Sequence, residues 1–414
     1  MKKIRIIGNY ITQFGELWDR SLESLFEEAT FGALNSVFGS IFDKKFVVHE
    51  HGTKVPESKF VVQEIEAVFV ANMAGGQFSN QLHLNALVSQ MLPHNPPAFR
   101  VEAACASGAM ALELAGQALL SGKYKTVLVV GAEKMTDAPA QDATKILSGA
   151  SEYQKEYGST FPALYALLAQ AHMRAFGTSR EQLSAVASKN HAHGVTNPKA
   201  QFRKEISADV ISASTLIADP LRLLDCSPVS DGAAAVILTV KNSKKYLAKP
   251  VIESVGHAQD SLNLADRESL TELKATRLAA EQAYSKAGIT PQNISFAEVH
   301  DCFTIAEILA SEDLGFFKKG DGGKAVFAGL TTYGKNLKKD RVVINPSGGL
   351  KACGHPVGAT GIKQVAFLAE LLQKQETVNK NKMYALAHNV GGSGATAIVH
   401  ILSKEFSKKS SRSK

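Results

Sequence analysis

Residues 345–361, NPSGGLKACGHPVGATG, contain five glycines, two prolines and one histidine ahead of a predicted helix. So many glycines in one loop indicate special backbone angles or a ligand pressed against the main chain. His355 stands between Gly354 and Pro356 and is therefore held rigidly. We predict that its imidazole is a catalytic group, the alternative being a structural loop histidine.

A second segment, EAACASGAMALELAG at residues 102–116, places a cysteine where a strand ends and a helix begins. The positive end of a helix dipole and its free N–H groups lower the pKa of a thiol at that position. Cys105 is thus a candidate nucleophile, although a buried cysteine packed among alanines is a common alternative. His355 within reach would take its proton and leave a thiolate.

The segment EVHDCFTIAEILA, residues 298–310, opens a helix with a cluster of reactive side chains. His300 and Cys302 are two residues apart, so they share a face if the strand continues. Asp301 either caps the helix or takes part in catalysis.

The segment ALAHNVGGSGATAIV, residues 385–399, has His388 followed by three glycines within four residues. It lacks both common phosphate-loop patterns, and a backbone N–H turned towards an oxyanion explains the glycines equally well. The turn before the strand at residues 232–240 has no obvious reagent, and we interpret Cys226 and Cys353 as small packing residues.

Short apolar runs alternate with helix-length segments along the chain, the pattern of sheets covered by helices. The first half predicts strands at 4–8, 67–71, 98–102 and 126–132, and helices at 22–40 and 106–121. The second half repeats this order with strands at 251–256, 296–299, 383–387 and 395–402, and helices at 278–287 and 358–373. A duplicated α/β unit fits this order better than one large sheet.

Between residues 134 and 230 the periodicity weakens, and the strand at 232–240 then resumes the first half, so we interpret this stretch as an insertion. The predicted domains are 1–133 with 231–245, the insertion at 134–230, the second half at 246–403, and a basic disordered tail at 404–414.

Composition excludes several classes of protein. The chain has 414 residues, 45% of them hydrophobic and 21% charged, as in an ordinary globular protein. Of its net charge of +7, the segment from Ser403 onward supplies +4 (five basic residues, one acidic), so 7 − 4 = +3 remains, too little for a nucleic-acid footprint. No long apolar run or signal-peptide pattern occurs, and four scattered cysteines suggest neither a disulfide framework nor a metal site. We therefore expect a cytoplasmic protein without membrane or metal.

These motifs, in this order, resemble the thiolase family along nearly the whole chain from Lys2 to Leu402. HDCF at 300–303 and HNVGG at 388–392 look like the sterol-carrier-protein type of thiolase, whereas other thiolases have NEAF and Cys-x-Gly there. The lipid-carrier domain of such fusions is not expected after Leu402. The resemblance implies two duplicated α/β halves in five layers, α-β-α-β-α, with an inserted loop domain, usually as a homodimer or homotetramer.

The resemblance also implies roles for individual residues. Cys105 would be acylated by an acyl-CoA or 3-ketoacyl-CoA with His355 as its base. Cys302 would exchange the α-proton, although His388 stands where the missing Cys-x-Gly cysteine is expected. His300 and His355 would donate to the thioester oxygen, and backbone N–H groups of Cys105 and Val390 would form a second oxyanion hole. Further residues expected to bind the acyl group or CoA are Tyr157, Phe161, Phe303, Gly354 and Gly391. Four basic residues of the insertion are candidates for the CoA phosphates, with a solvated surface position the favoured alternative for each: Lys189, Arg203, Lys204 and Arg222.

Coenzyme A is thus a substrate, and no cofactor is expected. The implied activity is that of an acyl-CoA:acetyl-CoA C-acyltransferase that makes or cleaves 3-ketoacyl-CoA. Two alternatives stay open: a ketoacyl synthase that uses carrier-protein substrates, and a thiolase-like subunit that is active only with an OB-fold partner. The cysteine of HDCF argues against a ketoacyl synthase. It also favours an enzyme that is active alone over a subunit that needs a partner. Neither the acyl chain length nor the direction used in cells follows from the sequence.

Overall fold

The computed structural model describes residues 2–38, 64–152, 154–333, 342–375 and 382–405. Ten strands form one sheet in the order β10-β9-β11-β12-β8-β1-β7-β4-β2-β3. The first half contributes β1 (Ile4–Ile11), β2 (Ala67–Ala71), β3 (Ala98–Val101), β4 (Thr126–Glu133) and β7 (Gly232–Thr239). The second contributes β8 (Val251–Gln259), β9 (Ile294–Glu298), β10 (Val343–Ile344), β11 (Lys382–Gly391) and β12 (Thr396–Glu405).

The two halves have the same topology. Numbered by chain order within each half, the strands lie in the order third, second, fourth, fifth, first, and in both halves the fifth is antiparallel to its two neighbours. The predicted duplication is confirmed. The two sets of five are nevertheless joined edge to edge, because Ile4 and Arg5 of β1 pair with Ile252 and Val251 of β8.

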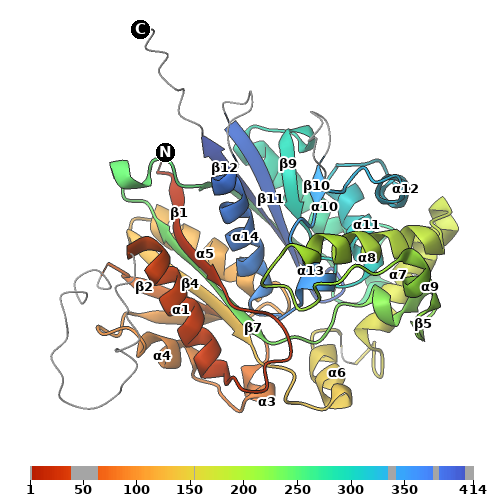
Figure 1. The fold of residues 1–414 in the computed structure, drawn as a ribbon, viewed down its shortest axis with the longest axis horizontal. Helices are drawn as coiled ribbons and strands as arrows, with labels where there is room; N and C mark the ends of the chain where they lie inside the picture. The colour runs from red at the N-terminus through yellow and green to blue at the C-terminus, as the bar shows by residue number, and fades with distance from the viewer. Residues whose placement is uncertain (1, 39–63, 153, 334–341, 376–381, 406–414) are drawn as a thin grey trace, which may run out of the picture.

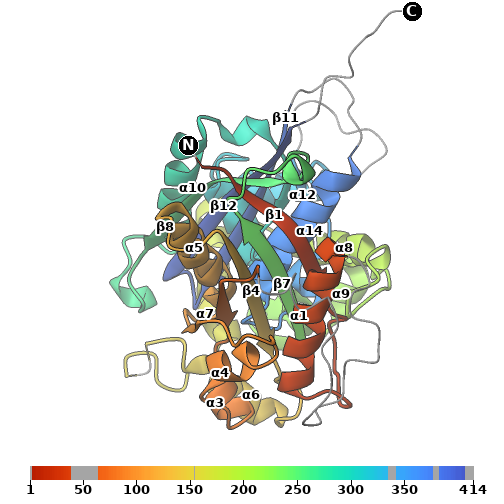
Figure 2. The same ribbon diagram turned by 90° about the vertical axis from the view of Figure 1, so that its left-hand side faces the viewer.

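Helices divide the molecule into layers. α5 (Ser107–Leu120) and α14 (Thr360–Lys374) lie in the middle and contact strands of both halves. They and the strands facing them form one core that draws residues from both halves. α1 (Leu22–Phe38) and α4 (Leu84–Ser89) cover the outer face of the first half, and α10 (Lys274–Ala287) covers that of the second. The predicted order α-β-α-β-α follows. Figure 1 shows the two halves on either side of α14, and Figure 2 shows the first half from its outer side.

The insertion between β4 and β7 forms helices and a two-stranded ribbon. These are α6 (Ala140–Ser148), α7 (Phe161–Phe176), α8 (Arg180–Val195), α9 (Ala208–Ala213), β5 (Leu216–Ala218) and β6 (Leu221–Arg222). α8 packs against three short helices of the second half, α11 (Thr304–Asp313), α12 (Gly322–Phe327) and α13 (Gly349–Cys353). A segment inserted in one half is therefore anchored on the other, as Figure 1 shows.

Several element boundaries differ from the sequence predictions. β1 extends to Ile11 because its end pairs with β7. α10 begins at Lys274, four residues earlier than predicted, after a turn held by the bond from Leu273 N to Asp313. β12 continues through Glu405 into the segment predicted as a tail. Residues 39–40 of the predicted first helix and 406–414 of the tail lie outside the described residues.

Candidate active site

Cys105 lies in a tight turn between β3 and α5. Ala104 takes a left-handed conformation, φ 50°, and Ser107 Oγ accepts a hydrogen bond from Ala103 N at 2.9 Å. The end of β11 passes so close that a Cβ on Gly391 would lie 2.8 Å from Ala103 O. The backbone N–H of the next residue, Gly392, donates to the sulfur of Cys105.

Hydrogen bonds fix the tautomer of His355. Its backbone N–H donates to Ser230 Oγ at 2.9 Å, and its Nδ1 lies 2.7 Å from Thr360 Oγ1. The hydroxyl of Thr360 donates to Pro356 O at 3.0 Å, so it accepts from Nδ1–H of His355. The remaining nitrogen, Nε2, carries the lone pair that a base needs. Gly354, with φ 108°, permits the turn that presents this ring.

His300 has the opposite tautomer. Asn389 Nδ2 lies 3.1 Å from its Nδ1 and donates to it, so the proton is on Nε2. Nε2 is buried and has no hydrogen-bond partner within the described residues. The rings of His300 and His355 meet edge to face with centroids 5.0 Å apart. The sulfur of Cys105 and one nitrogen of each ring lie within 4.8 Å of one another.

Cys302 faces the same pocket from the other side. Its sulfur contacts the hydroxyl of Tyr165 on α7, and that hydroxyl also donates to Gly392 O at 3.2 Å. The ring of Tyr165 stacks on Phe303 with centroids 4.6 Å apart. A second thiol is therefore placed near Cys105 by a residue of the insertion.

His388 lies behind the pocket and does not line it. Its Nε2 lies 2.9 Å from Thr276 Oγ1 on α10, and its Nδ1 accepts a long bond, 3.5 Å, from the backbone N–H of His300. Both ring nitrogens are thus engaged, and the side chain holds the backbone of His300 from behind.

The pocket has a volume of about 240 Å³. Of the predicted site residues, it is lined by Cys105, His300, Cys302, His355, Phe161 and Phe303. Tyr157 is 75% exposed and lies outside the lining, as do Gly354, Gly391 and Val390. The lining residues that the sequence analysis missed include Met135, Leu147, Tyr165, Ile217, Leu223 and Val357. Most belong to the insertion, where no motif marks them.

The comparisons with known proteins match both halves. A model of the thiolase N-terminal domain matches residues 31–242, and a model of the thiolase C-terminal domain matches residues 256–404. The chain belongs to the thiolase family.

Relatives of this thiolase are found along its whole length. It is 41% identical over 411 residues to the acetyl-CoA acetyltransferase of Methanothermobacter thermautotrophicus, covering 98% of this chain and 100% of the relative. It is 35% identical to sterol carrier protein 2 of Bos taurus over 73% of this chain and 58% of that protein. The solved structure titled Ltp2-ChsH2(DUF35) aldolase aligns with a TM-score of 0.76, covering 98% of this chain and 99% of that one, and at 20% identity it supports the fold.

Burial sets the charges in the pocket of this thiolase. It raises the pKa of Cys105 to about 12, despite the N–H of Gly392 that favours the thiolate. Burial, with the charge of Lys363, lowers the pKa of His355 to about 3. It also raises the pKa of Cys302 well above its usual value. The resting site is therefore neutral, whereas the sequence analysis expected a thiol pKa lowered by the helix dipole.

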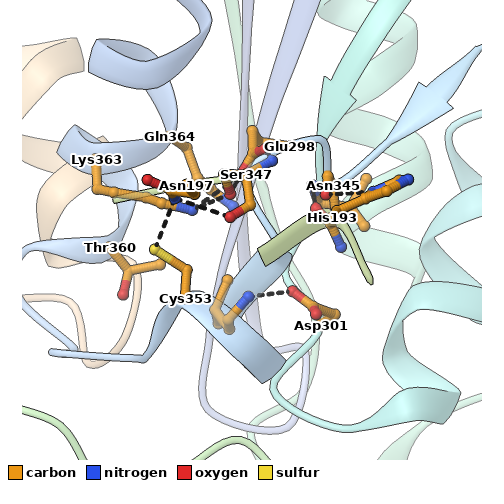
Figure 3. Close-up of polar contacts among 12 residues, drawn as sticks. His193, Asn197, Glu298, Asp301, Asn345, Ser347, Cys353, Thr360, Lys363 and Gln364 are labelled. Carbon is orange, nitrogen blue, oxygen red and sulfur yellow. Dashed lines mark hydrogen bonds and ion pairs between the residues drawn. The ribbon is translucent and has the colours of Figure 1, made fainter. Parts of the chain in front are cut away.

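A buried polar network lies beside Cys353 and Thr360, which stand on either side of His355 in the sequence (Figure 3). Lys363 Nζ lies 2.9 Å from a carboxylate oxygen of Glu298 and contacts the hydroxyl of Ser347. Asp301 accepts from the backbone N–H groups of Leu350, at 2.7 Å, and Lys351. Asp301 therefore ties the HDCF segment to the start of α13. Of the two alternatives for Asp301, the helix cap is wrong, because no side chain caps α11.

The candidates for CoA phosphate binding separate by exposure. Lys189 is buried, donates to Ile344 O at 2.9 Å and pairs with Glu307 at 2.7 Å, so it is not available to CoA. Arg203 and Lys204 are exposed, and Arg222 is half-buried with a guanidinium bond to Ser214 O at 2.7 Å.

Proposed function

We propose that this thiolase is an acyl-CoA:acetyl-CoA C-acyltransferase that works through an acyl group on Cys105. The observation that carries the proposal is the arrangement of Cys105, His300 and His355 within 4.8 Å, with a second thiol in the same pocket. Breaking a carbon–carbon bond next to a thioester needs a nucleophile, a proton donor or acceptor, and hydrogen-bond donors for the enolate. The pocket offers one group for each task.

In the proposed acylation step, Nε2 of His355 takes the thiol proton as the sulfur attacks the carbonyl carbon. The carbonyl oxygen becomes negative, and the backbone N–H of Gly392 is the donor that already contacts the sulfur. We therefore propose that the backbone N–H groups of Gly392 and Cys105 form the second oxyanion hole, with Gly392 in place of the expected Val390. In thiolysis the leaving group is the acetyl-CoA enolate, and in condensation it is the CoA thiolate, which takes the proton from His355.

Cys302 is the proposed proton donor to the enolate, and Nε2–H of His300 the donor to its oxygen. A thiol whose pKa burial raises is protonated at neutral pH, the form that thiolysis requires. His388 is a positioning residue in this scheme, because both of its ring nitrogens are engaged outside the pocket.

The decisive experiment is a spectrophotometric thiolysis assay with acetoacetyl-CoA, a longer 3-ketoacyl-CoA and free CoA. We expect turnover with at least one substrate and none with Cys105→Ala. The wild-type protein should also gain the mass of one acyl group on the peptide that contains Cys105. A folded protein without turnover on either substrate contradicts the proposal.

A second candidate function is a subunit that needs a protein partner. Ile217 and Leu223, which line the pocket, are 46% and 53% exposed, and the neighbouring Leu216 is 52% exposed, so together they offer an apolar surface that a partner would cover. The solved structure given above, Ltp2-ChsH2(DUF35) aldolase, is named after two components. Activity that appears only on adding a co-purified OB-fold protein would favour this function. Activity with acyl carrier protein but not CoA would favour a ketoacyl synthase.

We also propose a homodimer or homotetramer in the cytoplasm. The edge strand β3 carries Phe99, which is 41% exposed, and all four cysteines are free thiols, as a reducing compartment requires. No helix in the described ranges is long and apolar enough to cross a membrane. CoA enters this scheme as a substrate, and the expectations of no cofactor and no nucleic acid stay predictions.

A further inference from the structure

Three soft or borderline metal ligands converge in the pocket. Cys105, His300 and His355 come from three separate segments, and their donor atoms lie within 4.8 Å of one another. A thiolate and two imidazoles are ligands that Zn²⁺ prefers in tetrahedral sites. The pocket, about 240 Å³, leaves room for water in the fourth position.

The residues behind these ligands also suit a metal. Metal-bound histidines usually donate their other ring N–H to a fixed partner, which orients the ring. His355 already does so, because its Nδ1–H is bonded to Thr360 Oγ1 at 2.7 Å and its Nε2 carries a lone pair. Zinc would find this ligand in the required tautomer.

His300 needs one local change. Its Nε2 is buried and unpartnered, and it carries the proton while Asn389 Nδ2 donates to Nδ1 at 3.1 Å. The other amide atom, Asn389 Oδ1, has no partner within the described residues. Rotation of this amide by half a turn would let Oδ1 accept from Nδ1–H, with Nε2 then free to bind a metal.

We propose that Zn²⁺ binds reversibly to Cys105 Sγ, His300 Nε2 and His355 Nε2 and thereby inhibits the enzyme. Binding replaces the thiol proton, which passes to solvent, while both imidazoles stay neutral and His300 moves its proton from Nε2 to Nδ1. The metal takes the sulfur and the base together, so it competes with acylation. An acyl group on Cys105 or CoA in the pocket protects the enzyme.

The first test measures binding without turnover, with Co²⁺ as the spectroscopic probe for zinc. We expect one Co²⁺ per chain, with a sulfur-to-cobalt charge-transfer band and the visible bands of a tetrahedral site. Zn²⁺ should displace it. Cys105→Ser should remove the charge-transfer band, and His300→Ala or His355→Ala should weaken binding by at least about 100-fold. Cys226→Ser is the matched control, because Cys226 also lines the pocket but lies outside the ligand set.

Two outcomes overturn the proposal. The first is a charge-transfer band that survives Cys105→Ser but disappears in Cys302→Ser, which would assign the metal to the other thiol. The second is binding that all three ligand variants retain, with their folds verified by circular dichroism. Thr360→Val provides a milder variant and should weaken binding by about 10-fold. Because this test needs no substrate, its result is independent of the thiolase assay.

A second measurement links binding to inhibition. Zn²⁺ should inhibit thiolysis with an inhibition constant that, extrapolated to zero substrate, equals the Kd from Co²⁺ displacement, and a chelator should restore the activity. Acylation of Cys105 before addition of the metal should prevent binding. Inhibition that remains in full after acylation contradicts the assigned site.

Discussion

At the scale of single residues, the protonation of Cys105 is decided by its surroundings. The sequence shows the thiol before a helix, but not that desolvation of the thiol in the pocket opposes the helix dipole. Burial raises its pKa to about 12, so the free enzyme holds a thiol rather than a thiolate. Such a sulfur reacts when the substrate and His355 together accept its charge and its proton.

This protonation state is tested by alkylation. The thiolate fraction of a group titrating far above neutrality grows about tenfold per pH unit. The rate constant for inactivation of free enzyme by iodoacetamide should therefore rise about tenfold per unit between pH 7 and 9. Cys105→Ser reports the background reaction of the other thiols. A plateau below pH 7 would show a preformed thiolate–imidazolium pair instead.

The division of work between Cys302 and His388 is tested by their alanine variants. A positioned general acid or base contributes about 10²–10⁴-fold, so Cys302→Ala should lose at least about 100-fold in thiolysis and condensation. With acetyl-CoA as the acyl donor, from which no enolate leaves, it should still acylate Cys105, as seen by mass. His388→Ala should lose less, because the side chain acts through the backbone of His300. Full condensation in Cys302→Ala with loss in His388→Ala would reverse these roles.

Thr360 is expected to act only through His355. Removing its hydroxyl in Thr360→Val deletes the acceptor that holds Nδ1–H, so the ring samples other orientations. We expect kcat to fall about tenfold, within the range of one lost hydrogen bond. Thr360→Ser, which keeps the hydroxyl, should restore it. An unchanged kcat in Thr360→Val would remove Thr360 from the site.

At the scale of elements, the nucleophile Cys105 and its base His355 each lie just before one of two equivalent helices, α5 and α14. Each of α5 and α14 follows the third strand of its half, and their first turns touch backbone to backbone. A Cβ on Gly108 would lie 3.0 Å from Gly358 O and from two backbone nitrogens at the start of α14. These glycines allow the approach that brings Cys105 and His355 together.

Gly361→Ala tests this crossing. The added methyl would overlap Ala109 N and Asn389 Oδ1, so either the helices separate or Asn389 moves away from His300. We expect a loss of about 1–3 kcal/mol in the free energy of unfolding, measured in urea, together with reduced kcat. Gly116→Ala is the control, because it meets only the end of the Ile4 side chain, at 3.3 Å, within the same pair of helices. Equal effects of both substitutions would contradict the crossing.

Most elements of the two halves could be predicted, because their apolar runs match the periodicity of strands and helices. The short elements β10 (Val343–Ile344) and α4 (Leu84–Ser89) were not predicted. The helices inside the insertion could not be predicted. One of them, α8, buries polar side chains that show no apolar periodicity: Lys189, Asn190, His191 and His193. Contacts with the second half engage two of them: Lys189 pairs with Glu307, and His193 bonds to Asn345 O. Tyr165, which contacts Cys302, was missed for the same reason: no local pattern marks it.

At the scale of the whole molecule, buried histidines govern acid stability. Burial lowers the pKa of His355, His388 and His400 to about 3 from 6.5, so between these values the unfolded chain binds protons that the folded chain rejects. Their stabilising effect is complete above pH 6.5 and is lost as the pH falls. Glu133, whose pKa burial raises to about 7, acts in the opposite sense, and its contribution is lost as the pH rises through 7.

The chain therefore takes up protons when it unfolds near pH 5. Its free energy of unfolding should fall by at least about 1.4 kcal/mol for each unit by which the pH is lowered there. Urea titrations at a series of pH values measure this slope. His400→Leu removes one titrating group remote from the pocket. It should reduce the slope by the equivalent of one proton, about 1.4 kcal/mol per pH unit. An unchanged slope in that variant would show that His400 titrates normally in the folded protein.

The junction between the halves could not be predicted, because it rests on tertiary pairing rather than local pattern. Only Ile4 and Arg5 of β1 pair with β8, and nothing in either segment distinguishes an edge strand from a joining one. The duplication itself, in contrast, follows from the repeated alternation of strand and helix in the sequence.

The place of β7 between β1 and β4 has a consequence for synthesis on the ribosome. β1 (Ile4–Ile11) forms its long ladder with β7 (Gly232–Thr239), so it waits for more than half of the chain to be translated. Until then the backbone N–H and C=O groups along the edge of β1 that pairs with β7 have no partner strand. Pairing across such a sequence separation is slow. The nascent chain is thus exposed to aggregation and to capture by chaperones until β7 emerges from the exit tunnel.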